Sequence, residues 1–423
     1  MVSPKVAVAL GQAKEVTEQS AAYETLKTVV ENIKSISTPG HIAEDLIAIA
    51  DSSFGTPLGV VITRSLLGDF ITTLRSLQDH DMWIQVGQHI VRLITTGNPL
   101  ASSLVEQIAT LRELVATAHE ANEDFLDAAK ELCEIPLDSS QRRVPDAEKA
   151  AIWIRIVRNY LEVDDSTTAE TYLNKLKNVM HTVEDAELNL HFRLSAARIQ
   201  DSNRQFLQAA KSYHDLSFSP AIAEEERLHT LAMAIKCAIL APAGPMRSRA
   251  LGRLYKDERS AGLEEYGILE KMFFDRLLSA TEVDKFAQDL APHQLAKTSD
   301  GSTVLAKAVV EHNLLSASRL YSNIGFDELG LLLGLNGSKA EDTTAKMIEQ
   351  GRLSGSIDQI ERIIWFEGGE ASGEKGSGRA EVLVGKEMRR WDSNVQALAE
   401  DVERLTDALQ AEFPEFVAAR IAV

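Results

Sequence analysis

The feature that most constrains the fold is a helical pattern that recurs along the first two thirds of the chain. Up to Leu290, segments of roughly 12 to 20 residues carry apolar side chains at positions i, i+3, i+4 and i+7, as in DMWIQVGQHIVRLI. Short stretches that contain Pro or Gly separate these segments, and neither residue continues a helix readily. The pattern therefore predicts antiparallel helical hairpins.

One helix of the pattern recurs at the spacing of a two-helix repeat. FLDAAKEL and FLQAAKSY match closely, and TAETYL is a degenerate copy between them. This alignment brings Ala129, Ala169 and Ala210 into register about 40 residues apart, a period typical of helical-repeat proteins, and the small Ala side chain lets two helices approach closely. We therefore expect residues 1–291 to form a right-handed α-solenoid of TPR-like helical hairpins.

After Pro292 the pattern changes to the order of a winged-helix module. A long amphipathic helix, a short helix (FDELGLLLGL) and a third helix that opens with a capping-box spacing, Ser338 to Glu341, come first. GRLSGSIDQIERIIWFE follows, and its β-branched and aromatic residues predict a β-hairpin. An isolated hairpin is marginal in water, so we expect it to pack through its Ile, Trp and Phe side chains on the three helices, as the wing of a module spanning residues 292–367.

Two further segments follow the predicted wing. Residues 368–387 are rich in Gly, Ser and Glu and predict a flexible insertion. Residues 388–423 predict one long helix, whose apolar side chains alternate at spacings of four and three, as in a coiled-coil seam. This seam consists of Trp391, Val395, Leu398, Val402, Leu405 and Leu409. Such a helix is marginally stable alone, so we expect it to bind partner helices.

The motifs and the composition favour no enzymatic class. None of the ten His residues forms a His-x-His or His-Glu-x-x-His pattern, and neither a P-loop nor a Gly-x-Ser-x-Gly elbow occurs. We therefore name no catalytic, metal-binding or cofactor-binding residue and expect no small-molecule substrate. No apolar stretch reaches about 18 residues. We accordingly expect a protein of the nucleus and cytoplasm that does not contact a membrane.

Charge argues against nucleic acid as a partner. Lys and Arg number 44 against 63 Asp and Glu, a formal net charge of −19, which repels phosphates over most of the surface. The third helix of the predicted winged helix and the wing are both net acidic, whereas a module that reads DNA needs Lys and Arg at these positions. A winged-helix nucleic-acid-binding regulator is kept only as an alternative.

Two surfaces besides the C-terminal helix are candidates for binding a protein partner. The first is the wing, where an open strand edge can pair with a neighbour; its candidate residues are Ile357, Asp358, Ile360, Ile363 and Trp365. The second is the basic stretch MRSRALGRLYKDER, in which Arg247, Arg249 and Arg253 are candidates for docking an acidic partner. The alternative for that stretch is a solvated helix whose charges pair with neighbouring acidic side chains.

A helical solenoid that leads into a winged helix resembles the PCI family, which the proteasome lid, a translation initiation factor scaffold and the signalosome share. Three segments closely resemble one particular signalosome subunit. They are ILAPAGPMRSRALGRLYKDERSAGLEEYGILEKMFFDRLL, LAPHQLAKTSDGSTVLAKAVVEHNLLSASRLYSNI and GSIDQIERIIWFE. The resemblance runs from about Ser65 to Glu367 and resumes at Trp391.

The resemblance implies a non-catalytic scaffold subunit of the complex that removes a ubiquitin-like modifier from cullins. In that family the isopeptidase is a different subunit, the winged helices line up edge to edge, and the C-terminal helices gather in a bundle. The implied partners are the other PCI subunits, the isopeptidase subunits and cullin-RING ubiquitin ligases, towards which the solenoid reaches. The alternative within the family is a PCI subunit of the proteasome lid or of the initiation factor scaffold.

Overall fold

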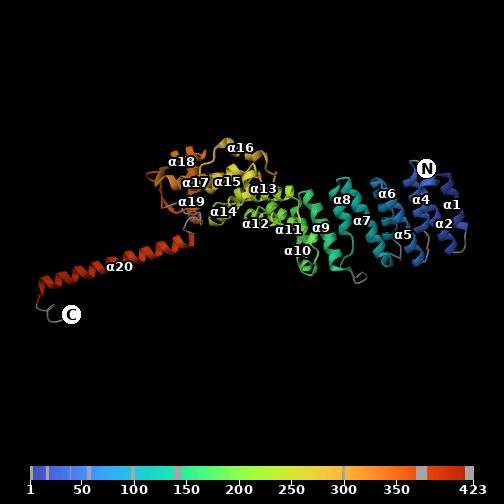
Figure 1. The fold of residues 1–423 in the computed structure, drawn as a ribbon, viewed down its shortest axis with the longest axis horizontal. Helices are drawn as coiled ribbons and strands as arrows, with labels where there is room; N and C mark the ends of the chain where they lie inside the picture. The colour runs from blue at the N-terminus through green and yellow to red at the C-terminus, as the bar shows by residue number, and fades with distance from the viewer. Residues whose placement is uncertain are drawn as a thin grey trace. The chain divides into compact units, whose positions relative to one another are not determined.

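The computed structural model describes residues 3–15, 19–38, 40–54, 59–96, 101–137, 144–297, 301–367 and 379–414. It divides into two compact units, Met1–Asn203 and Arg204–Val423. Helical hairpins, a winged helix and a long C-terminal helix follow one another along the chain, which confirms the predicted fold class (Figure 1). The predicted boundary at 291–292 falls within the second unit.

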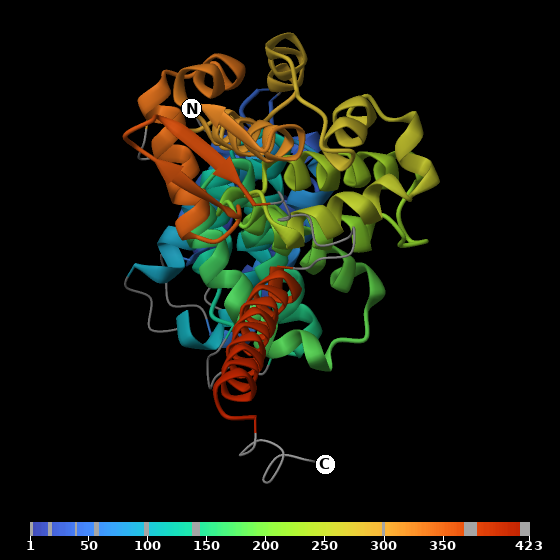
Figure 2. The same ribbon diagram turned by 90° about the vertical axis from the view of Figure 1, so that its left-hand side faces the viewer.

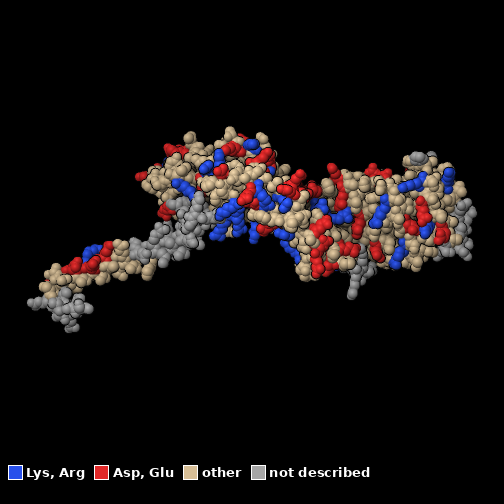
Figure 3. Space-filling view, viewed as in Figure 1, with Lys and Arg blue, Asp and Glu red and all other residues tan. Residues whose placement is uncertain are grey.

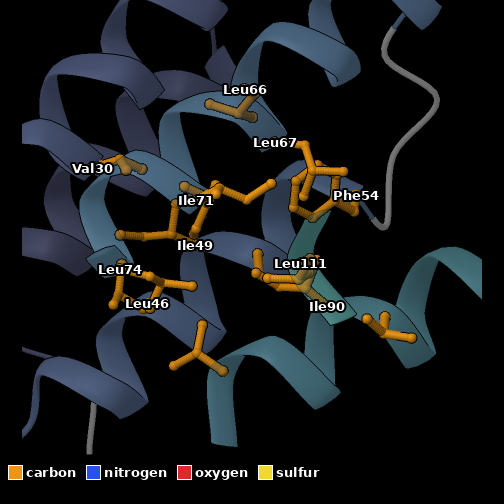
Figure 4. Packing of buried hydrophobic residues seen from close by; sticks show 14 of the residues in the cluster. Val30, Leu46, Ile49, Phe54, Leu66, Leu67, Ile71, Leu74, Ile90 and Leu111 are labelled. Carbon is orange, nitrogen blue, oxygen red and sulfur yellow. The ribbon is translucent and has the colours of Figure 1, made fainter. Parts of the chain in front are cut away.

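The first unit is built from helices that pack side by side in chain order (Figure 1). They are α1 (Pro4–Glu15), α2 (Gln19–Glu31), α3 (Ile33–Ile36), α4 (Ile42–Phe54), α5 (Val60–Leu77), α6 (His80–Thr95), the 3-10 helix η1 (Ala101–Ser103), α7 (Val105–Ala121), α8 (Phe125–Cys133), α9 (Asp146–Glu162), α10 (Ser166–Val179), η2 (Met180–Thr182) and α11 (Ala186–Ser202). Apolar side chains of α1 to α7 form one buried cluster, in which Ile49 of α4 and Ile71 of α5 point toward one another (Figure 4), and residues of α8 to α11 belong to a second cluster.

The same backbone turn recurs between paired helices. Its first residue has a positive φ of 53° at Gln78, 64° at Glu123, 60° at Asp164 and 60° at Arg204, and the next residue occupies the N-cap position of the following helix. After α7 and α9 the following amide also donates to the carbonyl oxygen five residues back, which is the Schellman geometry that satisfies a helix C-terminus. The last three turns are about 40 residues apart, so the period that the alanines predict is also a period of the turns.

The three alanines that define the predicted repeat are buried on second helices of hairpins. Ala129 lies on α8, Ala169 on α10 and Ala210 on α12 (Phe206–Leu216), and each is almost inaccessible to solvent. A longer side chain at these positions would push two packed helices apart. Their burial fits the expectation that the small Ala side chain lets helices approach closely.

The second unit holds the rest of the helical hairpins, the winged helix and the C-terminal helix. Its elements after α12 are α13 (Glu224–Leu240), α14 (Pro245–Tyr255), the 3-10 helix η3 (Glu258–Gly262), α15 (Tyr266–Phe273), α16 (Ala280–Gln288), α17 (Val304–Leu320), β1 (Asn323–Gly325), α18 (Phe326–Leu333), α19 (Gly337–Glu349), β2 (Gly355–Asp358), β3 (Ile363–Phe366) and α20 (Arg379–Glu412). The winged helix begins with α17, which the predicted order requires.

The wing is a three-stranded antiparallel sheet in the order β1-β3-β2 (Figure 2). The predicted hairpin is present as β2 and β3, and a third strand that the sequence analysis did not predict joins it: β1, which precedes α18 in the chain, pairs with β3 and places Asn323 opposite Trp365. The third strand pairs with the backbone hydrogen-bonding groups on the second edge of β3, and this explains how so short a hairpin is stable. The sheet thus has two edge strands, β1 and β2.

Two predicted boundaries near the C-terminus need correction. Helix α19 is capped by Asn336, whose side chain accepts a hydrogen bond from the Lys339 amide, so Ser338 lies inside the first turn instead of capping it. Helix α20 begins at Arg379, because the sequence RAEVLVGKE consists mainly of good helix formers. Residues 379–387 are therefore helical, and the remainder of the predicted insertion, 368–378, lies outside the described residues.

Candidate functional site

The C-terminal helix α20 exposes the predicted seam. Exposed fractions are 64% at Trp391, 45% at Val395 and 65% at Leu398, and Val402 and Leu405 are exposed to a similar degree. Leu409 is half-buried. A stripe of large apolar side chains that stays in water at heptad spacing is the surface that a partner helix buries in a coiled coil or bundle.

Polar side chains cover the opposite face of α20 and support the helix. Gln396 donates to the Glu400 carboxylate four residues on, and Arg404 donates to Asp401 at 2.8 Å. Interactions at these spacings stabilise an isolated helix by only a few tenths of a kcal/mol each, about 0.2–0.5. The helix is therefore amphipathic, with one apolar face available for association.

The wing buries different side chains from those that the sequence analysis selected. Ile364 and Phe366 of β3 point into the core of the winged helix, with Leu314 and Phe326 around them. Side chains alternate along a strand, so Trp365 points outward, where 45% of its surface is exposed. The expectation that Trp365 packs the wing onto the helices was wrong. Ile357 lies opposite Ile364 and is half-buried, as is Ile363.

The turn between β2 and β3 carries the other two predicted wing residues. Asp358 Oδ1 accepts hydrogen bonds from the amides of Ile360, at 2.9 Å, and Glu361, at 3.1 Å, which is an Asx-type turn. Asp358 therefore shapes the hairpin turn as well as lying on the surface. Ile360 projects from the tip with 94% of its surface exposed.

A hollow of about 610 Å³ lies beside the wing, between the outer face of β2 and α19. Trp365 and Ile360 give it apolar surface, and Glu341 and Asp358 give it negative charge, whereas its lining, as far as the structure describes it, includes neither Lys nor Arg. Gln359 donates to Glu341 at 2.7 Å across the hollow. An aromatic face next to carboxylates suits an apolar or cationic side chain of a partner.

A buried ion pair that the sequence did not reveal holds the base of the wing to the preceding helices. Glu311 of α17 is almost fully buried and accepts a 2.9 Å hydrogen bond from Arg352, which precedes β2. The Ala243 amide, before α14, donates to the same carboxylate, and the Ala243 carbonyl oxygen accepts from Arg352. Glu311 therefore joins three segments that are far apart in the sequence.

Two more buried groups next to this pair have shifted pKa values. Burial lowers the pKa of Arg247 to about 10, and Glu311 opposes that shift, so Arg247 stays charged. Burial, reinforced by the charge of Arg247, lowers the pKa of His312 to about 3. His312 is therefore neutral at physiological pH, with Nε2 within 2.8 Å of the Arg276 carbonyl oxygen that it bonds.

The basic stretch on α14 divides between the interior and the surface. Arg247 is only 4% exposed and donates to the Ala241 carbonyl oxygen, so it is unable to dock a partner and that prediction was wrong. Its burial follows from its spacing of four and seven residues from Leu251 and Leu254, both buried. Arg249 and Arg253 are exposed, and Lys and Arg gather around α14 (Figure 3).

The described residues also bear on membrane-spanning helices and metal sites. Among the described helices, none is both long and apolar enough to cross a membrane. Within the same ranges, no group of three or more His, Cys, Asp or Glu side chains is arranged to hold a metal ion. The surfaces that stand out are thus the α20 seam and the winged helix.

Comparisons with known proteins match the whole chain. The family described as PSMD12/CSN4, N-terminal, matches residues 6–225, and the PCI domain matches residues 282–367. The COP9 signalosome complex subunit 4 of Neurospora crassa is 63% identical over 438 residues, which cover 100% of this chain and 99% of that protein. The protein of the same name from Emericella nidulans is 48% identical, with 96% of this chain and 97% of that protein aligned.

More distant relatives bear the same name. The COP9 signalosome complex subunit 4 of Dictyostelium discoideum is 40% identical over 411 residues, which cover 96% of this chain and 98% of that protein. The resemblance to a PCI protein of the signalosome is confirmed, and the particular subunit that the three quoted segments resemble is the fourth.

Proposed function

The chain belongs to the COP9 signalosome subunit 4 family, and we propose on that premise that it is a non-catalytic scaffold subunit of a COP9 signalosome. Its task in this proposal is to hold other PCI subunits and the isopeptidase subunits together in the nucleus and cytoplasm. It also helps the complex to recognise cullin-RING ubiquitin ligases and to activate the isopeptidase for removal of the modifier from cullins.

The exposed seam of α20 is the observation that carries this proposal. Five large apolar side chains at heptad spacing remain in water on a helix that is too weak to be stable alone. Burial of one such side chain contributes about 1.5–3 kcal/mol, so a matching helix from another subunit gains much from covering the stripe. A helix bundle is thus the favoured mode of assembly.

The winged helix supplies a second means of assembly in this proposal. Strands β1 and β2 each have an edge that β3 does not cover, and an edge strand pairs readily with a neighbouring chain. The hollow beside β2 adds Trp365, an aromatic residue of the type enriched at interface hot spots. Both features fit the edge-to-edge line-up of winged helices that the PCI resemblance implies.

The test is purification of the native complex from cells that express a tagged variant of this chain. Replacement of Leu398, Val402 and Leu405 by Asp places three charges in the seam, and the expected result is loss of the other signalosome subunits from the purified material. Circular dichroism of the free variant should retain the helical signal of the hairpins, because the described core residues of the first unit all come from its own helices and loops.

A matched control distinguishes the effect of added negative charge from the effect of disrupting the seam. Asp at Gln396, Gln410 and Ala411 adds the same charge to exposed positions outside the apolar stripe, and this variant should purify with all its partners. Mass spectrometry of the wild-type material should contain signalosome subunits and cullins. Recovery of proteasome-lid or initiation-factor subunits in their place, or unchanged recovery with the seam variant, would refute the proposal.

A further inference from the structure

A groove separate from the wing hollow lies between α17 and α19, with a volume of about 340 Å³. Its α17 side is built from residues such as Ala306 and Val310, one helical turn apart, and its α19 side from residues such as Lys339, Lys346 and Met347. These spacings place each set on one face of its helix. The groove uses a different face of α19 from the one that carries Glu341.

The floor of the groove is apolar and its rim is cationic. Val310 and Leu335 are half-buried and Met347 is fully buried, whereas the ammonium-bearing side chains of Lys307, Lys339 and Lys346 are exposed at the rim. Lys339 and Lys346 lie two helical turns apart, about 10 Å at 1.5 Å per residue. The rim thus presents positive charge on both walls, above a surface that favours apolar groups.

Negative charge in the groove is smaller and partly neutralised. Asp342 is the exposed carboxylate among the lining residues, and Glu311 at the inner end is hydrogen-bonded to Arg352. Three lysines therefore outnumber one available aspartate locally, in a chain whose formal net charge is −19. An anion that approaches this chain meets repulsion over most of its surface and attraction here.

We propose that this groove binds an acidic, partly apolar peptide segment of a partner protein. The carboxylates of that segment pair with Lys307, Lys339 and Lys346, and one or two of its apolar side chains cover the half-buried Val310 and Leu335. The volume accommodates a few side chains but not a folded element. A nucleic acid fits less well, because a polyanion longer than the groove also meets Glu349 on the same helix and the net negative charge of the chain beyond the groove. This contact goes beyond the proposed assembly through α20 and the strand edges.

The test measures binding of a fluorescein-labelled peptide, Gly-Glu-Leu-Glu-Phe-Glu-Leu-Gly, to the full-length chain by fluorescence anisotropy. The expected result is saturable binding that weakens as salt rises, and at least tenfold weaker binding of the same peptide with Lys in place of Glu. A single-stranded oligothymidine is the third probe. Tighter binding of this oligonucleotide than of the acidic peptide would overturn the proposal.

Variants locate the binding site. Lys307→Glu, Lys339→Glu and Lys346→Glu together should weaken binding of the acidic peptide at least tenfold, and Ala306→Trp, which fills the groove without changing its charge, should weaken it as well. The matched control replaces three exposed lysines elsewhere with Glu, namely Lys5, Lys211 and Lys285, and should retain wild-type binding. Equal losses in the control and the groove variant would overturn the proposal.

The groove and the proposed scaffold function are tested independently. The variant with Asp at Leu398, Val402 and Leu405 leaves the groove intact and should bind the peptide as the wild type does. Absence of peptide binding in the wild type overturns the groove proposal alone, whereas loss of assembly is measured on the native complex with the seam variant.

Discussion

Removal of the Glu311 carboxylate should loosen the winged helix from the helices that precede it. Glu311→Ala leaves Arg352 without its 2.9 Å partner and leaves the Ala243 amide without an acceptor. Arg247, buried at 4% exposure, loses one of the two carboxylates, Glu311 and Asp275, that favour its charge. The substitution thus leaves the Arg352 guanidinium without its carboxylate and weakens the compensation of the buried charge of Arg247.

The expected cost follows from that burial. Removal of one partner from a buried ion pair destabilises a protein by about 3–5 kcal/mol, since the remaining charge is buried without compensation. A complete domain is stable by about 5–15 kcal/mol, so the loss is a large part of the stability of the module. Glu311→Gln keeps the shape and one acceptor oxygen, and it should cost less than Glu311→Ala.

A second Arg–carboxylate pair in the same module is the internal control. Arg362 donates to Asp327 at 3.0 Å, but the two side chains are 56% and 69% exposed. An exposed pair contributes only about 0.2–1 kcal/mol because water screens it, so Asp327→Ala should have little effect. The two variants remove a similar contact and differ in burial.

Hydrogen exchange measured by mass spectrometry is the suitable assay, because a chain of several units need not unfold in one step. Peptides from α17, α19 and β3 should exchange much faster in Glu311→Ala, at a rate increase of over 100-fold for about 3 kcal/mol, whereas peptides from α4 to α6 should not change. Equal protection in Glu311→Ala and Asp327→Ala would refute the reasoning from burial.

Three further predictions concern single side chains. Burial lowers the pKa of His312 from 6.5 to about 3 in the folded chain. Between these two pH values His312 is protonated only in the unfolded chain, so the free energy of unfolding falls by up to about 1.4 kcal/mol for each pH unit below 6.5. Urea titrations should therefore show a weaker dependence of stability on pH for His312→Gln. Gly87→Ala should cost about 1–3 kcal/mol in thermal unfolding, since the new Cβ would lie 2.4 Å from Val115 Cγ2, and Val115→Ala should recover part of the loss. Ile364→Ala should cost about 2–5 kcal/mol and Trp365→Ala less, and the reverse order of melting temperatures would contradict the assignment of inward and outward faces.

The helical part of the fold was predictable because its signal is repeated many times. Each hairpin has an apolar stripe of period 3.6, and Ala129, Ala169 and Ala210 add a second signal with a longer period. The strand β1 was not predictable, since the three residues Asn323–Gly325 are too few to show alternation and become a strand only by pairing with β3. Local sequence carries no information about such pairing.

The buried charges of the second unit were missed for a related reason. Arg247 lies in a run of basic residues, and its sequence neighbours Arg249 and Arg253 do face solvent. The available signal was the helical spacing, which groups Arg247 with Leu251 and Leu254 on the inner face of α14. Glu311, whose charge acts on Arg247, is 64 residues further along the chain, and only the fold brings these two residues together.

The apolar seam of α20 is unusual among the apolar stripes of the chain because the fold does not use it. Among the described residues, the core of the winged helix is formed by side chains such as Leu314, Phe326, Leu329 and Ile364, and none comes from α20. The module therefore completes its core before α20 begins, and seam residues such as Leu398 contribute little to the stability of the free chain. Their burial energy becomes available only when another helix covers them. For this reason substitutions in the seam should affect assembly far more than folding, whereas substitutions at Ile364 should affect both.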